Sequence, residues 1–133
     1  IGPPYSRVHL GGEMTVVTFV SVHTTRFPQS RDQLRQVREL LRLLESESGD
    51  LIVMGDFNAT PFSRITTTLE QGANIRRLTD LPTWPSRIHL PQVAIDHAFA
   101  SENFRVIGKQ QIGEAAGSDH YPIILTLARK QPQ

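Results

Sequence analysis

The chain contains no cysteine and no long apolar run. The absence of Cys among 133 residues excludes a disulfide scaffold and a thiolate metal site. No apolar stretch approaches the ~20 residues that a membrane-spanning helix needs. Charge of one sign is not in marked excess either, since Lys and Arg number 14 and Asp and Glu number 13. The net charge of +1 gives no general attraction to nucleic acid, although it is compatible with a local basic surface.

The length suits one domain with a substantial core, and no repeat or low-complexity segment marks a boundary within 1–133. The chain begins Ile1-Gly2-Pro3-Pro4 without an initiator Met, and a strand-like segment follows almost at once. We therefore expect it to be a piece of a longer polypeptide. Because a chain without Cys suits either side of a membrane, the cellular location stays unknown at this stage.

Runs of apolar and β-branched residues bounded by turn residues predict several strands. They cover residues 5–10, 14–23, 51–54, 93–100, 103–112 and 121–128, the last of them buried. Between the second and third strands, apolar residues at spacings of three and four predict a helix that starts at Ser30. Gly49 is predicted to end this segment in the left-handed conformation.

A strand, a helix of this length and another strand are typical of a βαβ crossover. Strands 14–23 and 51–54 should therefore be parallel, either as neighbours or with one strand between them. A shorter helix is predicted over 63–71 with Gly72 just beyond it, and 74–87 is predicted to be irregular. The pattern as a whole predicts an α/β fold with a mixed sheet flanked by helices.

The segment 51–61, LIVMGDFNATP, carries the clearest functional signal. Asp56 and Asn58 lie two residues apart, so in an extended backbone both side chains project to one side. Phe57 then points the other way, into the core. A carboxylate and a carboxamide at the end of a buried strand suit the binding of a water or of a metal-bound phosphate. An Asx-turn, in which either side chain bonds its own backbone, is the alternative.

Other polar residues also interrupt apolar strands or follow their ends: His23, Asp96, and the adjacent Asp119 and His120. Such groups need partners when buried. If the sheet brings these strand ends together, the groups can satisfy one another around one pocket. Each also has an ordinary interpretation. His23 can be an exposed loop residue, Asp96 can form a structural salt bridge, and Asp119 and His120 can belong to a simple turn.

The remaining histidines, at positions 9, 89 and 97, are predicted to be surface or packing residues. Arg76 and Arg77 are predicted to be a solvated charge pair, with a place beside an anionic ligand as the alternative. The candidate site holds three Asp, one Asn and two His. Its oxygen atoms suit Mg²⁺, Mn²⁺ or Ca²⁺ better than a structural zinc ion. The residues alone therefore indicate metal-assisted hydrolysis of a phosphate ester.

Several short motifs occur in a family-specific order: Ser21-Val22-His23, Gly55-Asp56-Phe57-Asn58, Ile95-Asp96-His97 and Gly117-Ser118-Asp119-His120-Tyr121-Pro122. With this set the chain resembles the endonuclease/exonuclease/phosphatase superfamily, which includes deoxyribonuclease-I-like nucleases, neutral sphingomyelinases and inositol-polyphosphate phosphatases. The likeness covers essentially the whole chain, but only the C-terminal half of the family domain. It implies one half of a four-layer α/β/β/α sandwich.

The resemblance also implies roles for five candidate catalytic residues. Asp56 would orient or activate the attacking water, and Asn58 would position that water or the phosphate. His120 would contact the scissile phosphate with Asp96 as its carboxylate partner. His23 matches the family's other catalytic or phosphate-binding His.

For the metal, the resemblance implies Mg²⁺, with Mn²⁺ as the alternative, near Asp119, Asn58 and Asp56. The substrate would be a phosphate ester of nucleic acid, of a lipid or of a small molecule. A non-catalytic binding module of the same fold is a further alternative. Residues 81–85, Leu-Pro-Thr-Trp-Pro, look most like a bacterial branch whose members are often preceded by membrane helices.

The chain departs from the family pattern at its N-terminal side. The family's first Asn and its principal metal-binding Glu belong to segments that would precede Ile1, and Glu13 stands in the wrong context to replace that Glu. We therefore expect the fragment alone to be weakly active or inactive. One face of its sheet should lack cover and associate with the missing N-terminal half or with a second copy.

Overall fold

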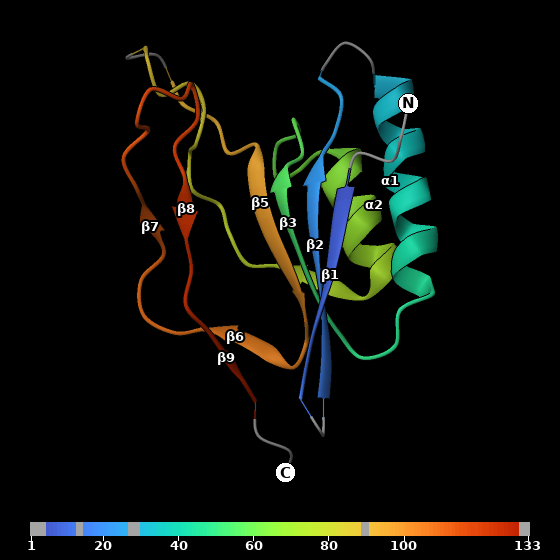
Figure 1. Cartoon of the computed structure of the whole chain (residues 1–133). Coiled ribbons are helices and arrows are strands. Elements are labelled where there is room, and N and C mark those ends of the chain that lie inside the picture. Colours follow the sequence, from blue (N-terminus) through green and yellow to red (C-terminus); the bar gives the residue numbers. More distant parts are fainter. Residues whose placement is uncertain (1–4, 13–14, 27–29, 89–90, 131–133) are drawn as a thin grey trace.

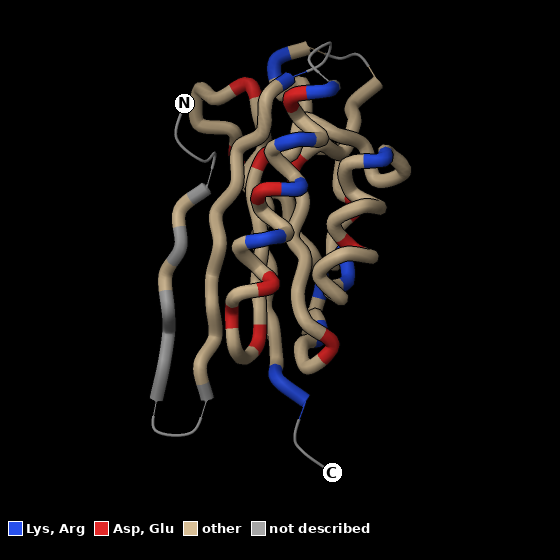
Figure 2. Tube along the Cα trace, turned by 90° about the vertical axis from the view of Figure 1, so that its right-hand side faces the viewer, with Lys and Arg blue, Asp and Glu red and all other residues tan. Residues whose placement is uncertain are grey.

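The computed structural model describes residues 5–12, 15–26, 30–88 and 91–130 (Figure 1). Its main feature is a five-stranded mixed sheet in the order β1-β2-β3-β5-β4. The strands are β1 Tyr5–Gly12, β2 Thr15–His23, β3 Asp50–Asp56, β4 Ile75–Arg77 and β5 Asp96–Ser101. Two helices, α1 Ser30–Glu45 and α2 Arg64–Ala73, cover one face of this sheet, as Figures 1 and 2 show. The predicted α/β class with a mixed sheet flanked by helices is confirmed.

The βαβ crossover is present. β2 and β3 are parallel neighbours joined by α1, whereas the other pairs in this sheet are antiparallel. Gly49 has φ +106°, and a Cβ at this position would lie 2.6 Å from the Val16 carbonyl oxygen. Glycine is therefore required where the chain turns back from α1 into β3.

The larger core lies between the sheet and the helices. Alternate side chains of the central strands point into it, because successive residues of a strand face opposite sides. Its fully or almost fully buried members include Val20, Val53, Phe57 and Phe99 from the sheet side and Val37, Leu40 and Leu69 from the helices. Phe57 thus faces the core, as its position between Asp56 and Asn58 predicted.

α2 ends two residues later than predicted, at Ala73, and so includes Gly72. A Cβ on Gly72 would lie 2.7 Å from a methyl carbon of Leu41, so glycine allows the two helices to approach closely. Asn74 caps the helix in the left-handed conformation, with φ +50°. The segment predicted to be irregular then contains β4, because its residues pair with the edge of β5.

The two C-terminal strand predictions were wrong in length. Residues 103–112 form β6 Phe104–Val106 and β7 Gln111–Ile112, and the chain changes direction near Gly108, whose φ is +75°. Residues 121–128 likewise contain β8 Ile123–Ile124 and the start of β9 Leu127–Arg129. β6 pairs with β9, and β7 pairs with β8.

The last strand is also not buried as predicted, since Ile124 is 52% exposed. These short strands lie on the helix-free side of the main sheet, where they cover only part of it (Figure 1). On this face Val8, Phe19 and Ile52 are register partners in one row, in which Ile52 packs against the second core cluster and Val8 is 52% exposed. Among the described residues, no helix is both long and apolar enough to cross a membrane.

Candidate active site

Three of the predicted site residues are aligned by strand register. His23 on β2 is the Cα partner of Asp56 on β3, and Asp56 is in turn the partner of Asp96 on β5. Residues directly opposite one another in a sheet point to the same face. The three side chains therefore meet at one end of the sheet, on the face away from the helices. β5 begins at Asp96, so this carboxylate lies at a strand end and not inside an apolar strand as predicted.

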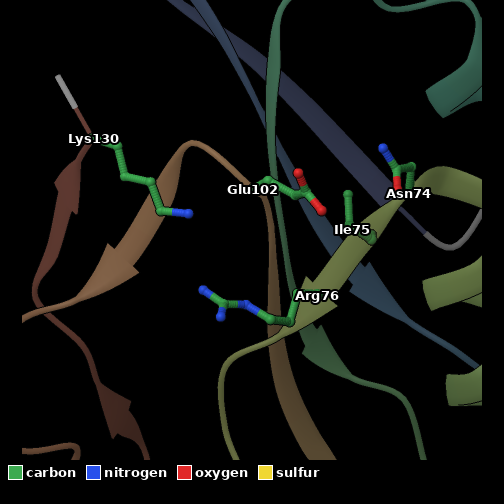
Figure 3. Close-up of a pocket in the computed structure, with 5 residues that line it drawn as sticks. All are labelled: Asn74, Ile75, Arg76, Glu102 and Lys130. Carbon is green, nitrogen blue, oxygen red and sulfur yellow. The ribbon is translucent and has the colours of Figure 1, made fainter. Parts of the chain in front are cut away.

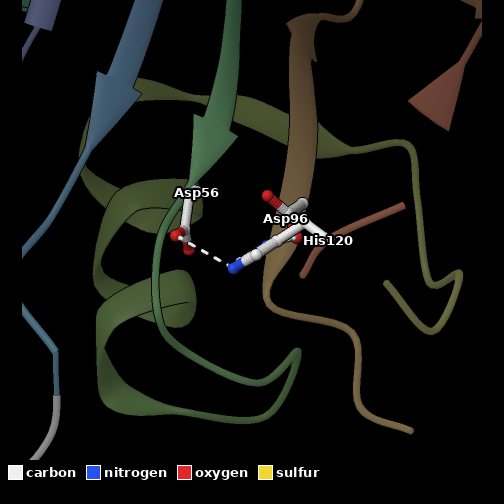
Figure 4. Close-up of side chains that lie close together, drawn as sticks. All are labelled: Asp56, Asp96 and His120. Atoms are coloured by element: carbon white, nitrogen blue, oxygen red, sulfur yellow. Dashed lines mark hydrogen bonds and ion pairs between the residues drawn. The ribbon is translucent and has the colours of Figure 1, made fainter. Parts of the chain in front are cut away.

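Asp56, Asp96 and His120 form a compact group, with ligand atoms that all lie within 4.8 Å of one another (Figure 4). The Nδ1 atom of His120 lies 2.8 Å from Oδ2 of Asp96, which is hydrogen-bond distance. The opposite ring nitrogen, Nε2, lies 3.8 Å from Oδ2 of Asp56. With Nδ1 donating to the Asp96 carboxylate, the ring is oriented so that Nε2 faces Asp56.

His23 and Asn58 lie on either side of Asp56. Nε2 of His23 is 3.7 Å from Oδ2 of Asp56, and the His23 side chain is 73% exposed. The backbone N–H of Asn58 donates to Oδ1 of Asp56 at 2.8 Å, while its side-chain amide donates to the Thr24 carbonyl at 2.8 Å. The alternative Asx-turn thus coexists with the cluster, because Oδ1 of Asp56 bonds the backbone and Oδ2 faces the two histidines.

The pKa of Asp56 is raised above 3.8. Burial is the main cause, because it disfavours the charged carboxylate, and the nearby charge of Asp96 acts in the same direction. The hydrogen bond from the Asn58 backbone and the two histidines lower the pKa, but not enough to cancel the increase. A carboxylate of raised pKa holds a proton more readily, which suits a group that accepts one from water.

Thr83 connects the two members of the His120–Asp96 pair. Its carbonyl accepts from Tyr121 N at 2.9 Å, next to His120. Its hydroxyl accepts long bonds from Ile95 N at 3.5 Å and from Asp96 N at 3.4 Å. Thr83 is fully buried and therefore holds these two segments at a constant separation. The sequence analysis did not identify this residue, and no local pattern distinguishes it from an ordinary loop threonine.

Gln33 is a second residue that the sequence analysis did not assign to the site. It is buried on α1, and its amide donates to the carbonyls of Phe57 at 2.8 Å and Asn58 at 3.2 Å. It also lies 3.3 Å from the Thr24 hydroxyl, which itself donates to the Phe57 carbonyl. One side chain thus supports the loop after His23 and the loop after Asp56. A buried glutamine at a position of the apolar helix face is the signal that could have revealed it.

Asp119 does not belong to the group formed by Asp56, Asp96 and His120. Its side chain accepts a hydrogen bond from the Trp84 side chain, and its carbonyl accepts from Ser86 N. Desolvation acts to raise the pKa of Asp119, but its own backbone N–H, His120, Trp84 and Arg26 together lower it. The metal-binding role of Asp119 remains a prediction.

His97 packs as predicted. It is 2% exposed, its ring lies 6.0 Å from the rings of Phe57 and Phe99, and Nε2 is 2.7 Å from the Ala59 carbonyl. Burial lowers the pKa of His97, so the ring is held neutral. Glu13 and His89 lie outside the described residues, and the side chain of His9 is likewise not described.

The donor atoms of the cluster can accommodate a metal ion. The carboxylates of Asp56 and Asp96 and the imidazole of His120 lie close enough together to contact one ion. Hard divalent cations in phosphate sites take one or two protein carboxylates besides water and substrate oxygens. His120 is already hydrogen-bonded to Asp96, so a cation at this place would rely chiefly on carboxylate oxygens.

Comparisons with known proteins identify the family of this chain. Residues 2–120 match the Endonuclease/Exonuclease/phosphatase family, and the chain belongs to that family. No curated protein sequence matches it.

Among similar solved structures is the catalytic domain of human nocturnin with bound sulfate, with a TM-score of 0.70 at 16% identity, covering 95% of this chain and 53% of that chain. Another is mannosyl-6-phosphatase Bt3783 from Bacteroides thetaiotaomicron (TM-score 0.63, 16% identity, 87% and 52% covered). A third is a variant of Staphylococcus aureus beta toxin with bound magnesium ions (TM-score 0.65, 14% identity, 97% and 58% covered). At such identities these likenesses establish the fold alone. The chain spans about half the length of the first structures it matches.

Proposed function

We propose that this chain, completed by the other half of its domain, hydrolyses a phosphate ester with the help of Mg²⁺, or of Mn²⁺ in its place. The observation that carries the proposal is the His120–Asp96 hydrogen bond of 2.8 Å together with the 3.8 Å between His120 Nε2 and Asp56. The Asp56 carboxylate, which can accept a proton, thus faces Nε2 of His120, while Nδ1 of the same ring is hydrogen-bonded to Asp96. Membership of the family supports hydrolysis of a phosphoester in general terms.

In this proposal Asp56 accepts a proton from water while the water oxygen attacks phosphorus. The bond from phosphorus to the leaving oxygen breaks, and that oxygen takes up a proton from solvent. The raised pKa of Asp56 brings its basicity closer to that required of a general base. Asn58, at the adjacent turn, orients the water or a phosphate oxygen.

His120 contacts a non-bridging phosphate oxygen through Nε2. Asp96 accepts from Nδ1, which fixes the ring orientation and stabilises positive charge on the imidazole as negative charge develops on the phosphate. His23, the most exposed of the group, meets the substrate from the solvent side. Mg²⁺, when bound, supplies positive charge to the phosphate oxygens. Asp56, Asn58 and Asp119 are the proposed protein contacts of the ion, and Asp96 adds a nearby carboxylate.

A neighbouring hollow of about 310 Å³ offers room for the rest of the substrate. It is lined by Arg26, Asn58, Trp84, Val93 and Ile95, so it combines one cation with a mainly apolar wall. Such a wall and the near-neutral net charge of the chain favour a second candidate substrate class, a lipid or inositol-type phosphate, beside nucleic acid. Parallel assays with nicked DNA, sphingomyelin and an inositol phosphate distinguish these classes.

The direct test is hydrolysis of bis(4-nitrophenyl) phosphate by the intact protein, measured with Mg²⁺ and with a chelator. His120→Ala is expected to lower kcat about 10²–10³-fold, the usual effect of removing a group that stabilises the transition-state charge. Asp80→Asn changes an exposed carboxylate outside the site and serves as the matched control. Activity of His120→Ala within twofold of the unchanged protein, roughly the spread of such assays, would sink the proposal.

The helix-free face is proposed to bind the other half of the domain. Val8, Phe19 and Ile52 present a partly exposed apolar row there, and the chain covers only 52% of several structures that it matches. Burial of such a row stabilises association by removing apolar surface from water. Without that half, we expect the chain to form homodimers through this face. Gel filtration that returns a monomer at high concentration would contradict this expectation.

A further inference from the structure

Three cationic side chains, those of Arg76, Arg105 and Lys130, lie around two adjoining hollows toward the end of the sheet opposite the His120–Asp96 pair. One hollow, of about 230 Å³, is lined by Asn74, Ile75, Arg76, Glu102 and Lys130 (Figure 3). The other, of about 320 Å³, is lined by Arg76, Arg77, Leu78, Arg105 and Val106. Arg76 lines both, so the two hollows adjoin, and together they are called the basic site.

The charge at this site differs in sign from that of the rest of the chain. Three of the 14 cationic side chains but only one of the 13 anionic ones lie here. The remaining eleven cations and twelve anions leave the rest of the chain slightly negative. A positively charged hollow on an otherwise negative molecule concentrates small anions, whereas a long polyanion would also meet the negative remainder.

The cationic side chains of this site make few hydrogen bonds or ion pairs within the described part of the protein. Arg76 donates once, from Nη2 to the Phe104 carbonyl at 3.3 Å, and no ion pair or side-chain hydrogen bond of Arg105 or Lys130 occurs within the described ranges. Arg77 is the register partner of the core residue Phe99, so its side chain lies on the helix side of the sheet and is not counted among the cations of this site.

We propose that this basic site binds a small phosphorylated anion. The planar guanidinium groups of Arg76 and Arg105 match phosphate oxygens in pairs, and the ammonium group of Lys130, the residue after β9, adds a point charge. In Figure 3 the side chains of Arg76 and Lys130 extend toward the same space, with Glu102 beside it. Glu102 offsets one of the positive charges, and the net positive charge that remains suits a multiply charged ligand such as a triphosphate.

The site is separate from the proposed catalytic group. Asp96 begins β5, and Arg76 is the register partner of Ala100, four residues further along, so about 13 Å of extended chain separates the two positions. A phosphate bound at Arg76 is therefore not the one that His120 contacts. Arg76 lies on the face away from the helices, since its neighbour Ile75 is buried in the helix-side core.

The test is isothermal titration of the full chain with sodium triphosphate, at low salt and with a chelator present. We expect one saturable site per chain whose affinity falls at least about tenfold in Arg76→Gln and in Arg105→Gln, with a smaller loss in Arg76→Lys. Lys130→Gln should also weaken binding, and its exposed side chain makes it the safest variant for folding. Arg38→Gln, an exposed arginine on α1, is the matched control and should bind normally.

Asp56→Asn should leave triphosphate binding unchanged, because its carboxylate lies at the other end of β5. Loss of binding in Asp56→Asn, or an equal loss in Arg38→Gln, would overturn the proposal, as would the absence of saturable binding. Binding of an oligonucleotide or of anionic vesicles without binding of triphosphate would overturn it as well. All of these outcomes are measured as binding and not as hydrolysis, so they test the basic site independently of the proposed reaction.

Discussion

Substitution of Gln33 by Leu should destabilise the protein even though Leu nearly preserves the side-chain volume. The Gln33 amide donates to two carbonyls just after the end of β3, those of Phe57 and Asn58. The Phe57 carbonyl keeps a second donor in the Thr24 hydroxyl, whereas that of Asn58 loses its described donor. One unsatisfied carbonyl together with the lost bonds costs about 1–3 kcal/mol.

This cost can be measured by urea unfolding. With a denaturant slope of about 1–3 kcal/mol per molar for a small protein, the midpoint should fall by about 1 M. Gln71→Leu is the matched control, because Gln71 is exposed on α2 and should change the free energy of unfolding by less than about 0.5 kcal/mol. Gln33→Glu keeps the size of the side chain but removes its hydrogen-bond donor, since an ionised Glu cannot donate and would face carbonyl oxygens. Its stability should therefore recover as the pH falls and the carboxyl becomes protonated.

If Gln33→Leu unfolds at the same urea concentration as the unchanged protein, the reasoning is refuted. A loss in Gln71→Leu as large as in Gln33→Leu would refute it too, because the effect would then belong to any glutamine on a helix. A role for Gln33 in positioning predicts in addition that kcat falls more than KM rises, since the two loops that it supports directly follow His23 and Asp56.

Asp56→Asn should abolish most hydrolysis yet raise stability at neutral pH. A raised carboxyl pKa contributes stability below pH 3.8 that is lost as the pH rises through the folded pKa, so the advantage of Asn should vanish in acid urea titrations. Gly55→Ala should cost about 3 kcal/mol or more, because a Cβ at φ +145° would lie 1.9 Å from the Val22 carbonyl oxygen; near-normal thermal unfolding would contradict this. Thr83→Val, nearly isosteric, should lower kcat about tenfold by loosening Asp96, whereas Thr67→Val on the exposed side of α2 should not.

Local patterns determined the first half of the fold. The apolar stripe of α1, the short apolar run of β3 and the left-handed Gly49 each depend on neighbours a few residues away, so they were readable from sequence. The inward direction of Phe57 followed from strand alternation in the same way. The C-terminal strands were misjudged, because their lengths depend on pairing between 104–112 and 123–129.

The sequence by itself determined which side chains could do chemistry, because polar residues at the ends of apolar strands stand out locally. Only the tertiary structure decided how they are grouped. Strand register aligns His23, Asp56 and Asp96, and the loop held by Thr83 brings His120 to Asp96 while Asp119 turns toward Trp84. The physical reason is that contacts between residues 24 to 64 positions apart depend on the packing of the whole sheet, and no local spacing in the chain encodes them.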